Sequence, residues 1–244
     1  MKYAYDLHMH SCLSPCGDGQ MTPNNLVGLA KLAGLDVIAL TDHNTCKNTP
    51  AAVAVGDHFG ILVLPGMELN TAEEIHVLCL FEALENAMAF DAYVETRLVK
   101  VKNDVEVFGN QTVMDEDDNA VAEYPWLLTM ATDIRIEEVP ALVAGYGGVA
   151  VPAHVDRDAY SILSVLGALP PELDFKTIEV TRIGGRDKLA ALAPELSARY
   201  GILENSDAHY MESIPEPLIH MELQNLTRKD VLNAIRFGQI TVQS

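Results

Sequence analysis

Histidines and carboxylates recur along the chain, and most of them directly follow an apolar run. The first group is His8 and His10 in YDLHMHS, and the last is Asp207 and His209 in NSDAH. Side chains two positions apart in an extended strand point to the same side, so each pair can bind one ion. Imidazole and carboxylate ligands suit zinc, iron or manganese. The residues of the same kind at or near intervening strand ends are Asp42, His43, Glu68, His76 and His154.

Each of these motifs alone has an ordinary explanation as a helix cap, a turn or a core histidine. Those explanations would have to apply independently at each strand end, which makes a shared site the better interpretation. In a barrel of parallel strands, the loops that follow the strands meet on one face, where active sites are built. We therefore expect a metal centre assembled from distant segments.

The elements that must position these residues are short apolar runs alternating with helical patterns, as is typical of βα units. Thr22 and Pro23 predict the start of a helix and Gly34 its end. The run DVIAL follows as a buried strand, and GILVL, HVLCLF, TIEVTR and GILEN repeat the pattern. About seven parallel strands favour a closed α/β barrel over an open sheet.

Residues 109–124 interrupt this alternation. Alternating residues flank the acidic turn DEDD, which predicts a hairpin outside the barrel framework. Helical patterns follow over about 125–131 and 136–146. We predict a single domain over residues 1–244 with an insertion at about 103–135.

The composition gives further expectations about partners and location. The chain has 244 residues, 16 basic and 35 acidic, with a formal charge of −19. This charge argues against long duplex nucleic acid as a partner but does not exclude a small phosphorylated substrate such as a nucleotide or a short oligonucleotide. No signal peptide or membrane span is visible, so we expect a cytoplasmic protein that binds no membrane. Four cysteines then predict thiols or ligands rather than disulfides. The oligomeric state stays open.

An ordered set of motifs resembles the PHP superfamily, named for polymerase and histidinol phosphatase domains. The set runs from Asp6 to about Tyr210 as DLHMHS, GDG, LTDHN, PGMELN, EIHVLCLF, PAHVDR and NSDAHY. The resemblance implies a distorted seven-stranded (β/α)7 barrel and metal-dependent phosphoester hydrolysis with two or three ions of zinc, manganese or iron. It implies one ion held by His8, His10, Glu68 and Asp207, a second by Glu68, His76 and His154, and a third by His43, His209 and a loop residue.

The loop residue is where the chain departs from its relatives. They carry an Asp in SDG or a His shortly after H-x-H, whereas this chain reads SPCGDG. We favour Asp18, because the glycines on either side let the loop fold inward, over Cys16. A Cys16 thiolate would shift the preference toward zinc. A structural zinc site built on Cys12 and Cys16 is disfavoured, because no second cysteine pair has finger-like spacing.

Arg157 occupies the place of a phosphate-contacting arginine in relatives, with a surface ion pair as the alternative. The predicted activity is hydrolysis, through a metal-bound hydroxide, of a phosphomonoester or terminal phosphodiester in a small nucleotide or phosphorylated metabolite. Asp207, His209 and Arg157 are the expected catalytic residues. Histidinol-phosphate phosphatase is one alternative, and a catalytically silent metal-binding regulatory protein is another.

Several other polar residues have weaker assignments. Asp42 is expected to orient a neighbouring imidazole, and Glu179 is either part of a family-like motif or structural. Arg182 and Arg186 could bind phosphate or form surface contacts. His58 and His220 are expected to be structural or exposed.

Overall fold

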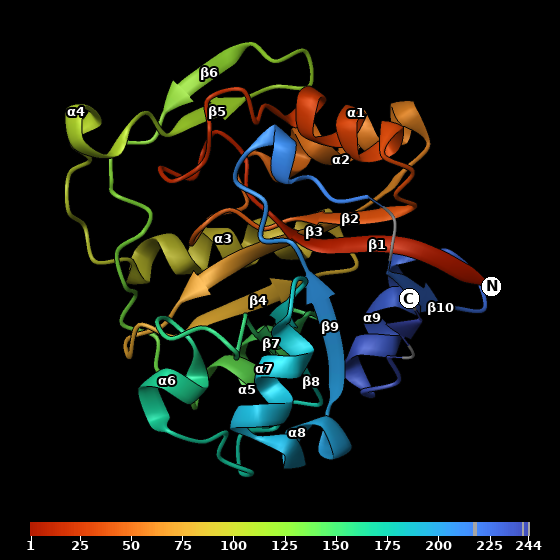
Figure 1. The fold of residues 1–244 in the computed structure, drawn as a ribbon. Helices are drawn as coiled ribbons and strands as arrows, with labels where there is room; N and C mark the ends of the chain where they lie inside the picture. Colours follow the sequence, from red (N-terminus) through yellow and green to blue (C-terminus); the bar gives the residue numbers. More distant parts are fainter. Residues whose placement is uncertain (217–218, 241, 244) are drawn as a thin grey trace.

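The computed structural model describes residues 1–216, 219–240 and 242–243 of the chain. Its main feature is a curved mixed sheet with the strand order β11-β10-β1-β2-β3-β4-β7 (Figure 1). A parallel pair, β8-β9, lies between β7 and β1 and extends the curved sheet toward a barrel. The strands are β1 (Lys2–Met9), β2 (Val37–Leu40), β3 (Leu62–Asn70), β4 (His76–Leu80), β7 (Val149–Pro152), β8 (Thr177–Thr181), β9 (Gly201–Asn205), β10 (His220–Glu222) and β11 (Val242–Gln243).

The predicted α/β class is confirmed, but the uniform parallel arrangement is wrong. Strands β1, β2 and β3 pair in parallel, whereas β4 is antiparallel to both β3 and β7. Only residues 71–75 connect β3 to β4, and a parallel crossover needs about a dozen residues or more. The described strands hydrogen-bond as one sheet of seven and two sheets of two, so the (β/α)7 count is not confirmed.

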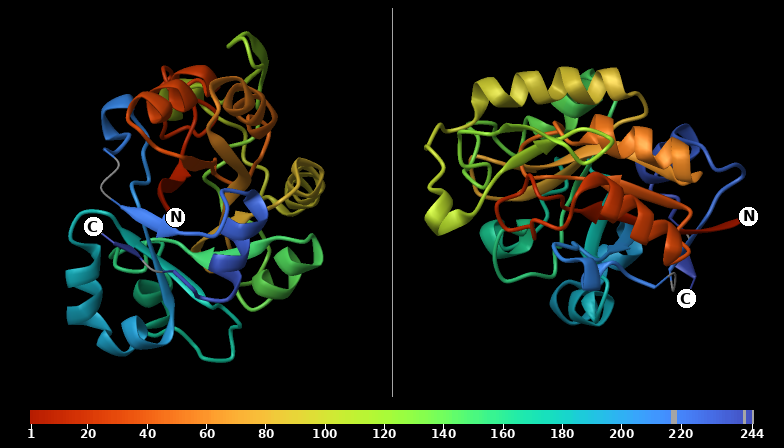
Figure 2. Two further views of the ribbon diagram at one scale, coloured as in Figure 1. Left: turned by 90° about the vertical axis from the view of Figure 1, so that its right-hand side faces the viewer. Right: turned by 90° about the horizontal axis from the view of Figure 1, so that it is seen from above.

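Helices α1 (Pro23–Leu32) and α2 (Thr49–Phe59) cover one face of β2 and β3 (Figure 2). The Thr22 hydroxyl accepts a hydrogen bond from the Asn25 N–H, and Pro23 begins the helix as predicted. Gly34 adopts a φ of 90°, the left-handed conformation that ends this helical segment. Leu26 and Val27 are buried against the strands, which fixes the loop before α1 beside the end of β1.

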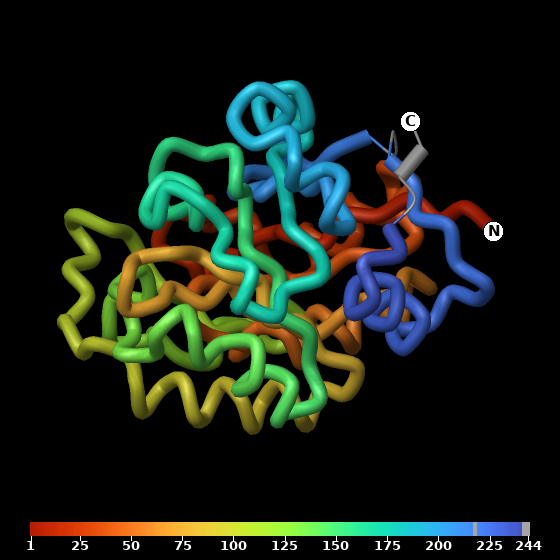
Figure 3. Tube along the Cα trace, turned by 90° about the horizontal axis from the view of Figure 1, so that it is seen from below, coloured from red at the N-terminus to blue at the C-terminus, as the bar shows by residue number. Residues whose placement is uncertain are grey.

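The remaining helices pack around the curved sheet. Helix α3 (Leu84–Arg97) buries Phe90 and Val94 beside Phe81. Tyr5 and Leu7 of β1 belong to a second core cluster, which α9 (Arg228–Arg236) completes. Figure 3 shows α3 on the opposite side of the molecule from α7 and α8. The other helical segments are α5 (Val139–Gly145), α6 (Ile162–Leu166), α7 (Gly185–Leu192), α8 (Pro194–Arg199) and the short 3-10 helix η1 (Met211–Ser213). Within the described residues, no helix is both long and apolar enough to cross a bilayer.

The predicted hairpin is confirmed by β5 (Thr112–Met114) and β6 (Ala120–Glu123), which follow the short helix α4 (Val105–Phe108). The helix predicted over 125–131 is wrong. The Gln111 side chain binds the carbonyls of Tyr124 and Trp126 and the N–H of Leu128, so backbone groups that a helix would use are already engaged. The division into one domain with an insertion at about 103–135 stays a prediction.

Candidate metal centre

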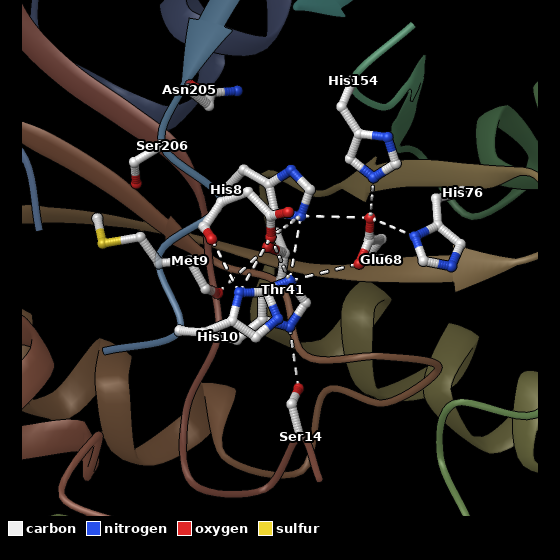
Figure 4. Close-up of polar contacts among 12 residues, drawn as sticks. His8, Met9, His10, Ser14, Thr41, Glu68, His76, His154, Asn205 and Ser206 are labelled. Atoms are coloured by element: carbon white, nitrogen blue, oxygen red, sulfur yellow. Dashed lines mark hydrogen bonds and ion pairs between the residues drawn. The ribbon is translucent and has the colours of Figure 1, made fainter. Parts of the chain in front are cut away.

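The structure brings together every predicted ligand except Asp18. Figure 4 shows the rings of His8, His10, His76 and His154 directed toward the carboxylate of Glu68. Glu68 is 1% exposed and stands in β3, while the two histidines of H-x-H are fully buried at the end of β1. The gathered residues are His8, His10, His43, Glu68, His76, His154, Asp207 and His209.

The donor atoms of His8, His10, Glu68 and Asp207 are spaced as the ligands of a single ion. Ligands of a tetrahedral ion with bonds of ~2.0–2.1 Å lie roughly 3.3 Å apart. The His8 and His10 Nε2 atoms are 3.1 Å apart. Nε2 of His8 is 3.3 Å from Glu68 and 3.2 Å from Asp207, and Nε2 of His10 is 3.3 and 3.1 Å from the same carboxylates. The distances to Glu68 involve Oε1 for His8 and Oε2 for His10, so the four residues surround a position of the size of one cation, at which Glu68 can offer either oxygen.

Glu68 also connects this group to its neighbours. Its Oε1 lies 2.8 Å from Nδ1 of His76 and 3.1 Å from Nε2 of His154, and its Oε2 lies 2.9 Å from Nδ1 of His43. Two further groups have donor atoms within 4.8 Å of one another: His43 with Glu68 and His76, and His10 with His43 and His209. The carboxylate is therefore placed to bridge ions.

A second set of side chains fixes the ring orientations. Glu179 lies 2.9 Å from Nδ1 of His8 and also accepts from the His154 N–H and the Asn205 amide. The sequence alone leaves this role open, although a glutamate within the apolar strand TIEVT is a signal for a buried polar partner. A metal-binding histidine commonly uses its other ring nitrogen in this way.

His10 is held through a chain of hydroxyl and carboxylate groups. Its Nδ1 is 3.0 Å from Oγ of Ser14, which donates to Asp42 at 2.7 Å. Asp42 also accepts from the N–H and hydroxyl of Ser11. Asp42 thus acts on the imidazole through Ser14 and is not part of the ligand cluster.

The buried carboxylates shift the pKa values of the surrounding imidazoles. Burial by itself lowers the pKa of His10, but the adjacent Asp207 and Glu68 carboxylates reverse this effect and raise it to about 9. At His43, burial likewise lowers the pKa, but the charge of Glu68 outweighs this effect and raises the pKa to about 9. Burial dominates at His76, whose pKa falls to about 4, and at His209, where it falls to about 3. The buried carboxylates thus stabilise positive charge in the cluster, whether it is supplied by protons or by metal ions.

Two site residues have left-handed backbone conformations. His154 has a φ of 30° and Asp207 a φ of 53°. Such conformations cost about 1–3 kcal/mol each and persist where the surrounding structure enforces them. The folded chain therefore tolerates local strain to direct these two side chains into the cluster.

The described residues also leave polar atoms in the cluster without hydrogen bonds. They include Oδ1 of Asp207 and Nδ1 of His43, both buried. His43 and Asp207 are close to opposite-charge partners but are not aligned for hydrogen bonds. Buried polar atoms normally have partners, so the donor set fits divalent cations bound at Glu68.

The loop after β1 places Cys16 and Asp18 differently. Sγ of Cys16 is 3.1 Å from Nε2 of His209. The Asp18 carboxylate instead accepts a hydrogen bond from the N–H of Gln20 within its own turn. The four cysteines are free thiols, and Cys46 and Cys79 are buried in the core.

Arg157 lies at the edge of the cluster, with Nη1 2.7 Å from Oδ2 of Asp207. It borders a cavity of about 410 Å³ that also contains His76, Tyr160 and Lys188. Arg182 and Arg186 point elsewhere: the first donates to the Glu216 carbonyl and the second pairs with Glu204. His58 and His220 lie outside the ligand cluster, in α2 and β10.

Comparison with known proteins gives a consistent picture. An uncharacterized protein of Methanocaldococcus jannaschii is 32% identical over 99 residues, covering 37% of this chain and 58% of the relative. A 5'-3' exoribonuclease of Haemophilus influenzae is 37% identical over 83 residues, covering 33% of this chain and 29% of the relative. The chain thus matches only part of each relative's length.

Among solved structures, the lesion-specific endonuclease Q of Pyrococcus furiosus has a TM-score of 0.66 at 19% identity, covering 97% of this chain and 56% of that protein. A structure of endonuclease Q with a 27-mer duplex carrying an abasic lesion at the active site has a TM-score of 0.65. This finding overturns the exclusion of long duplex nucleic acid. Net charge sums the whole chain, whereas phosphate binding depends on the field at the site, to which bound cations contribute.

The family assignment rests on the sequence profile of the PHP domain, which matches residues 6–128. This range is half of the chain and runs from within β1 to beyond β6, with the H-x-H pair, His43, Glu68 and His76 inside it. The remaining cluster residues come from the later strands, which the fold likeness covers. The chain belongs to the PHP domain family.

Proposed function

We propose that this chain is a metal-dependent hydrolase that cleaves a phosphomonoester or a terminal phosphodiester at the end of a nucleic-acid strand. The observation that carries the proposal is the spacing of 3.1–3.3 Å among the donor atoms of His8, His10, Glu68 and Asp207. The relative named as an exoribonuclease supports the choice of a strand end.

The proposed ligands are the eight clustered residues, which would hold two or three ions of zinc, manganese or iron, with Glu68 shared between two of them. Such ions, when bound, lower the pKa of a coordinated water and neutralise charge on phosphoryl oxygens. The protein's own contribution is to hold the imidazoles through Glu179 and Ser14 and to keep Asp207 directed into the cluster. Phosphoryl transfer depends mainly on such positioning and electrostatic stabilisation, so no side-chain nucleophile is required.

Arg157 is the proposed phosphate-binding residue. Its guanidinium presents planar, paired donors that match phosphate oxygens. It forms an ion pair with Asp207, so a phosphate at the cluster would be within reach of both the arginine and the ions. His209 is 3.5 Å from the same carboxylate and is proposed to act as a ligand; since its pKa is lowered to about 3 it carries no available proton at neutral pH, so water is the proposed proton source for the leaving oxygen.

The cavity beside Arg157 is the proposed site of the terminal nucleotide. Tyr160 is half exposed and stacks on His76, with ring centroids 4.8 Å apart at 22°. Its φ of 55° is enforced in part by the hydrogen bond that its carbonyl accepts from the His76 N–H. Tyr160 can stack a base, and Lys188 on the facing helix α7 can bind a phosphate.

A substrate panel tests the proposal. Metal-stripped protein is supplied separately with zinc, manganese and iron(II), then offered 5'-labelled single strands, blunt and recessed duplexes, free nucleotides, histidinol phosphate and an aryl phosphate. We expect metal-dependent release of phosphate or a mononucleotide from strand ends. Protein with full metal occupancy and no turnover on any member of the panel would indicate a binding protein and refute the proposal.

A further inference from the structure

The loop between β1 and α1 directs a cysteine toward the metal cluster. Sγ of Cys16 lies 3.1 Å from Nε2 of His209, whose donor atoms are grouped with those of His10 and His43. Ligands with bonds of ~2.3 Å to sulfur and ~2.0 Å to nitrogen lie roughly 3.5 Å apart in a tetrahedral zinc site. A small rotation of this exposed side chain would give that spacing.

The backbone of the loop fixes this placement. The Gly17 N–H donates to the Ser14 carbonyl at 2.8 Å, and the Asp18 N–H donates to the His209 carbonyl at 2.9 Å. A Cβ atom at Gly17 would lie only 2.5 Å from the Ser11 carbonyl oxygen, so the turn is too tight for a side chain there. The turn therefore presents Cys16, the residue just before this glycine, to the imidazoles.

The imidazoles independently form a group that can bind a cation. The donor atoms of His10, His43 and His209 lie within 4.8 Å of one another. His43 is 6% exposed, and its Nδ1, 2.9 Å from Oε2 of Glu68, makes no aligned hydrogen bond among the described residues. Asp18 offers this group no ligand in its present conformation, because its carboxylate caps the turn at Gln20.

We propose that Cys16, as a thiolate, is a ligand of the cation held by His43 and His209. Binding forms one metal–sulfur bond, and the proton of the Cys16 thiol is released to solvent. A thiolate favours zinc and other soft cations over manganese or magnesium. This position would therefore prefer zinc more strongly than the group around Asp207, whose ligands are only nitrogen and oxygen atoms. The inference rests on the proposed metal centre but not on any particular substrate.

Cobalt(II) provides a test that is independent of turnover. Metal-stripped wild-type protein, Cys16→Ser and Asp18→Asn are reconstituted with cobalt, and bound cobalt and near-ultraviolet absorption are measured together. We expect a thiolate-to-cobalt charge-transfer band in the wild type and in Asp18→Asn, and its loss in Cys16→Ser. Zinc competition with a chelator should show a loss of affinity of at least about 10-fold at one site in Cys16→Ser.

The possible failures are distinguishable. Cobalt bound by the wild type without the band would overturn the Cys16 assignment and leave the metal centre intact. The Cys16 assignment is equally overturned if the band persists in Cys16→Ser or disappears in Asp18→Asn. A wild type that binds no cobalt would overturn both the assignment and the proposed metal centre. Circular dichroism of the variants verifies that each comparison concerns folded protein.

Discussion

Oε1 of Glu179 lies 2.9 Å from Nδ1 of His8, and this contact determines which nitrogen of the ring faces the cluster. A carboxylate only accepts hydrogen bonds, so in the neutral ring the proton is on Nδ1 and the lone pair is on Nε2. Nε2 is the atom that lies among His10, Glu68 and Asp207. Glu179 thus prepares His8 as a ligand without belonging to the ligand set.

Glu179→Gln should weaken metal binding by about 10–100-fold, the usual effect of losing such a partner. The amide keeps the shape of the side chain but removes the charge that fixes the ring. Competition with a chromophoric chelator measures the change, and Glu137→Gln is a matched control because Glu137 is exposed, pairs with Arg135 and lies outside the cluster. Equal affinities in the two variants would show that Glu179 has no positioning role.

His8→Ala and Asp207→Ala should each remove bound metal and phosphoester hydrolysis together. Each substitution deletes one of the four donor atoms of this ion, so we expect the affinity at this position to fall and hydrolysis to be lost with the ion. Elemental analysis and turnover are measured on the same preparations, with His58→Ala in α2 as the control. An active, fully metallated His8→Ala protein would contradict the proposed site.

The metal-free protein should lose stability as the pH rises from about 6.5 to 9. The folded pKa values of His10 and His43 are raised to about 9, so folding binds protons that the unfolded chain has already released in this interval. The resulting stabilisation is complete below about pH 6.5 and is lost as the pH passes 9, at most about 3 kcal/mol for each group. Urea unfolding at several pH values measures it.

Metal should abolish this dependence, because bound imidazoles are already deprotonated. His76 and His209 act in the opposite direction: their lowered pKa values, about 4 and about 3, stabilise the fold above pH 6.5 and less as the pH falls. The metal-free protein is therefore expected to be most stable near pH 6.5. A flat profile from pH 6.5 to 9 without metal would contradict the assigned shifts.

Lys188→Met should raise KM for a nucleic-acid end by roughly 10-fold, the effect of losing one charged hydrogen bond, with a smaller change in kcat. Lys176→Met is the matched control, since Lys176 is exposed and pairs with Asp174. Tyr160→Leu should raise KM for nucleotide substrates but not for an aryl phosphate, and Tyr160→Phe should retain wild-type behaviour. Unchanged KM in both Lys188→Met and Tyr160→Leu would place the substrate outside this cavity.

The sequence was most informative where side-chain chemistry and strand position coincide. The pairs His8 with His10 and Asp207 with His209 were identified from period-two spacing, and the structure places their side chains in one cluster. The antiparallel direction of β4 was missed, because the apolar pattern of HVLCLF is the same for either strand direction. Only the short connection between β3 and β4 indicates that the chain turns back.

Other features could not be derived from local pattern. Whether Asp18 or Cys16 faces the cluster depends on the turn at Gly17 and on contacts with the distant His209. The role of Glu179 could not be read from the sequence, because its partner His8 is 171 positions away. The exclusion of duplex substrates failed because a sum of charges contains no information about where they lie.

The cluster joins opposite ends of the polypeptide. Asp6 of β1 accepts hydrogen bonds from the N–H of Ser206, 200 positions further along, and His8 meets Asp207 just beside this junction. During synthesis, a chain that has emerged only as far as β8 would contain His8, His10 and Glu68 but not yet Asp207, the fourth ligand of the group. Tight capture of a cation by these four residues must therefore wait until Asp207 has been synthesised, and the captured ion would then hold β1 to the segment that follows β9.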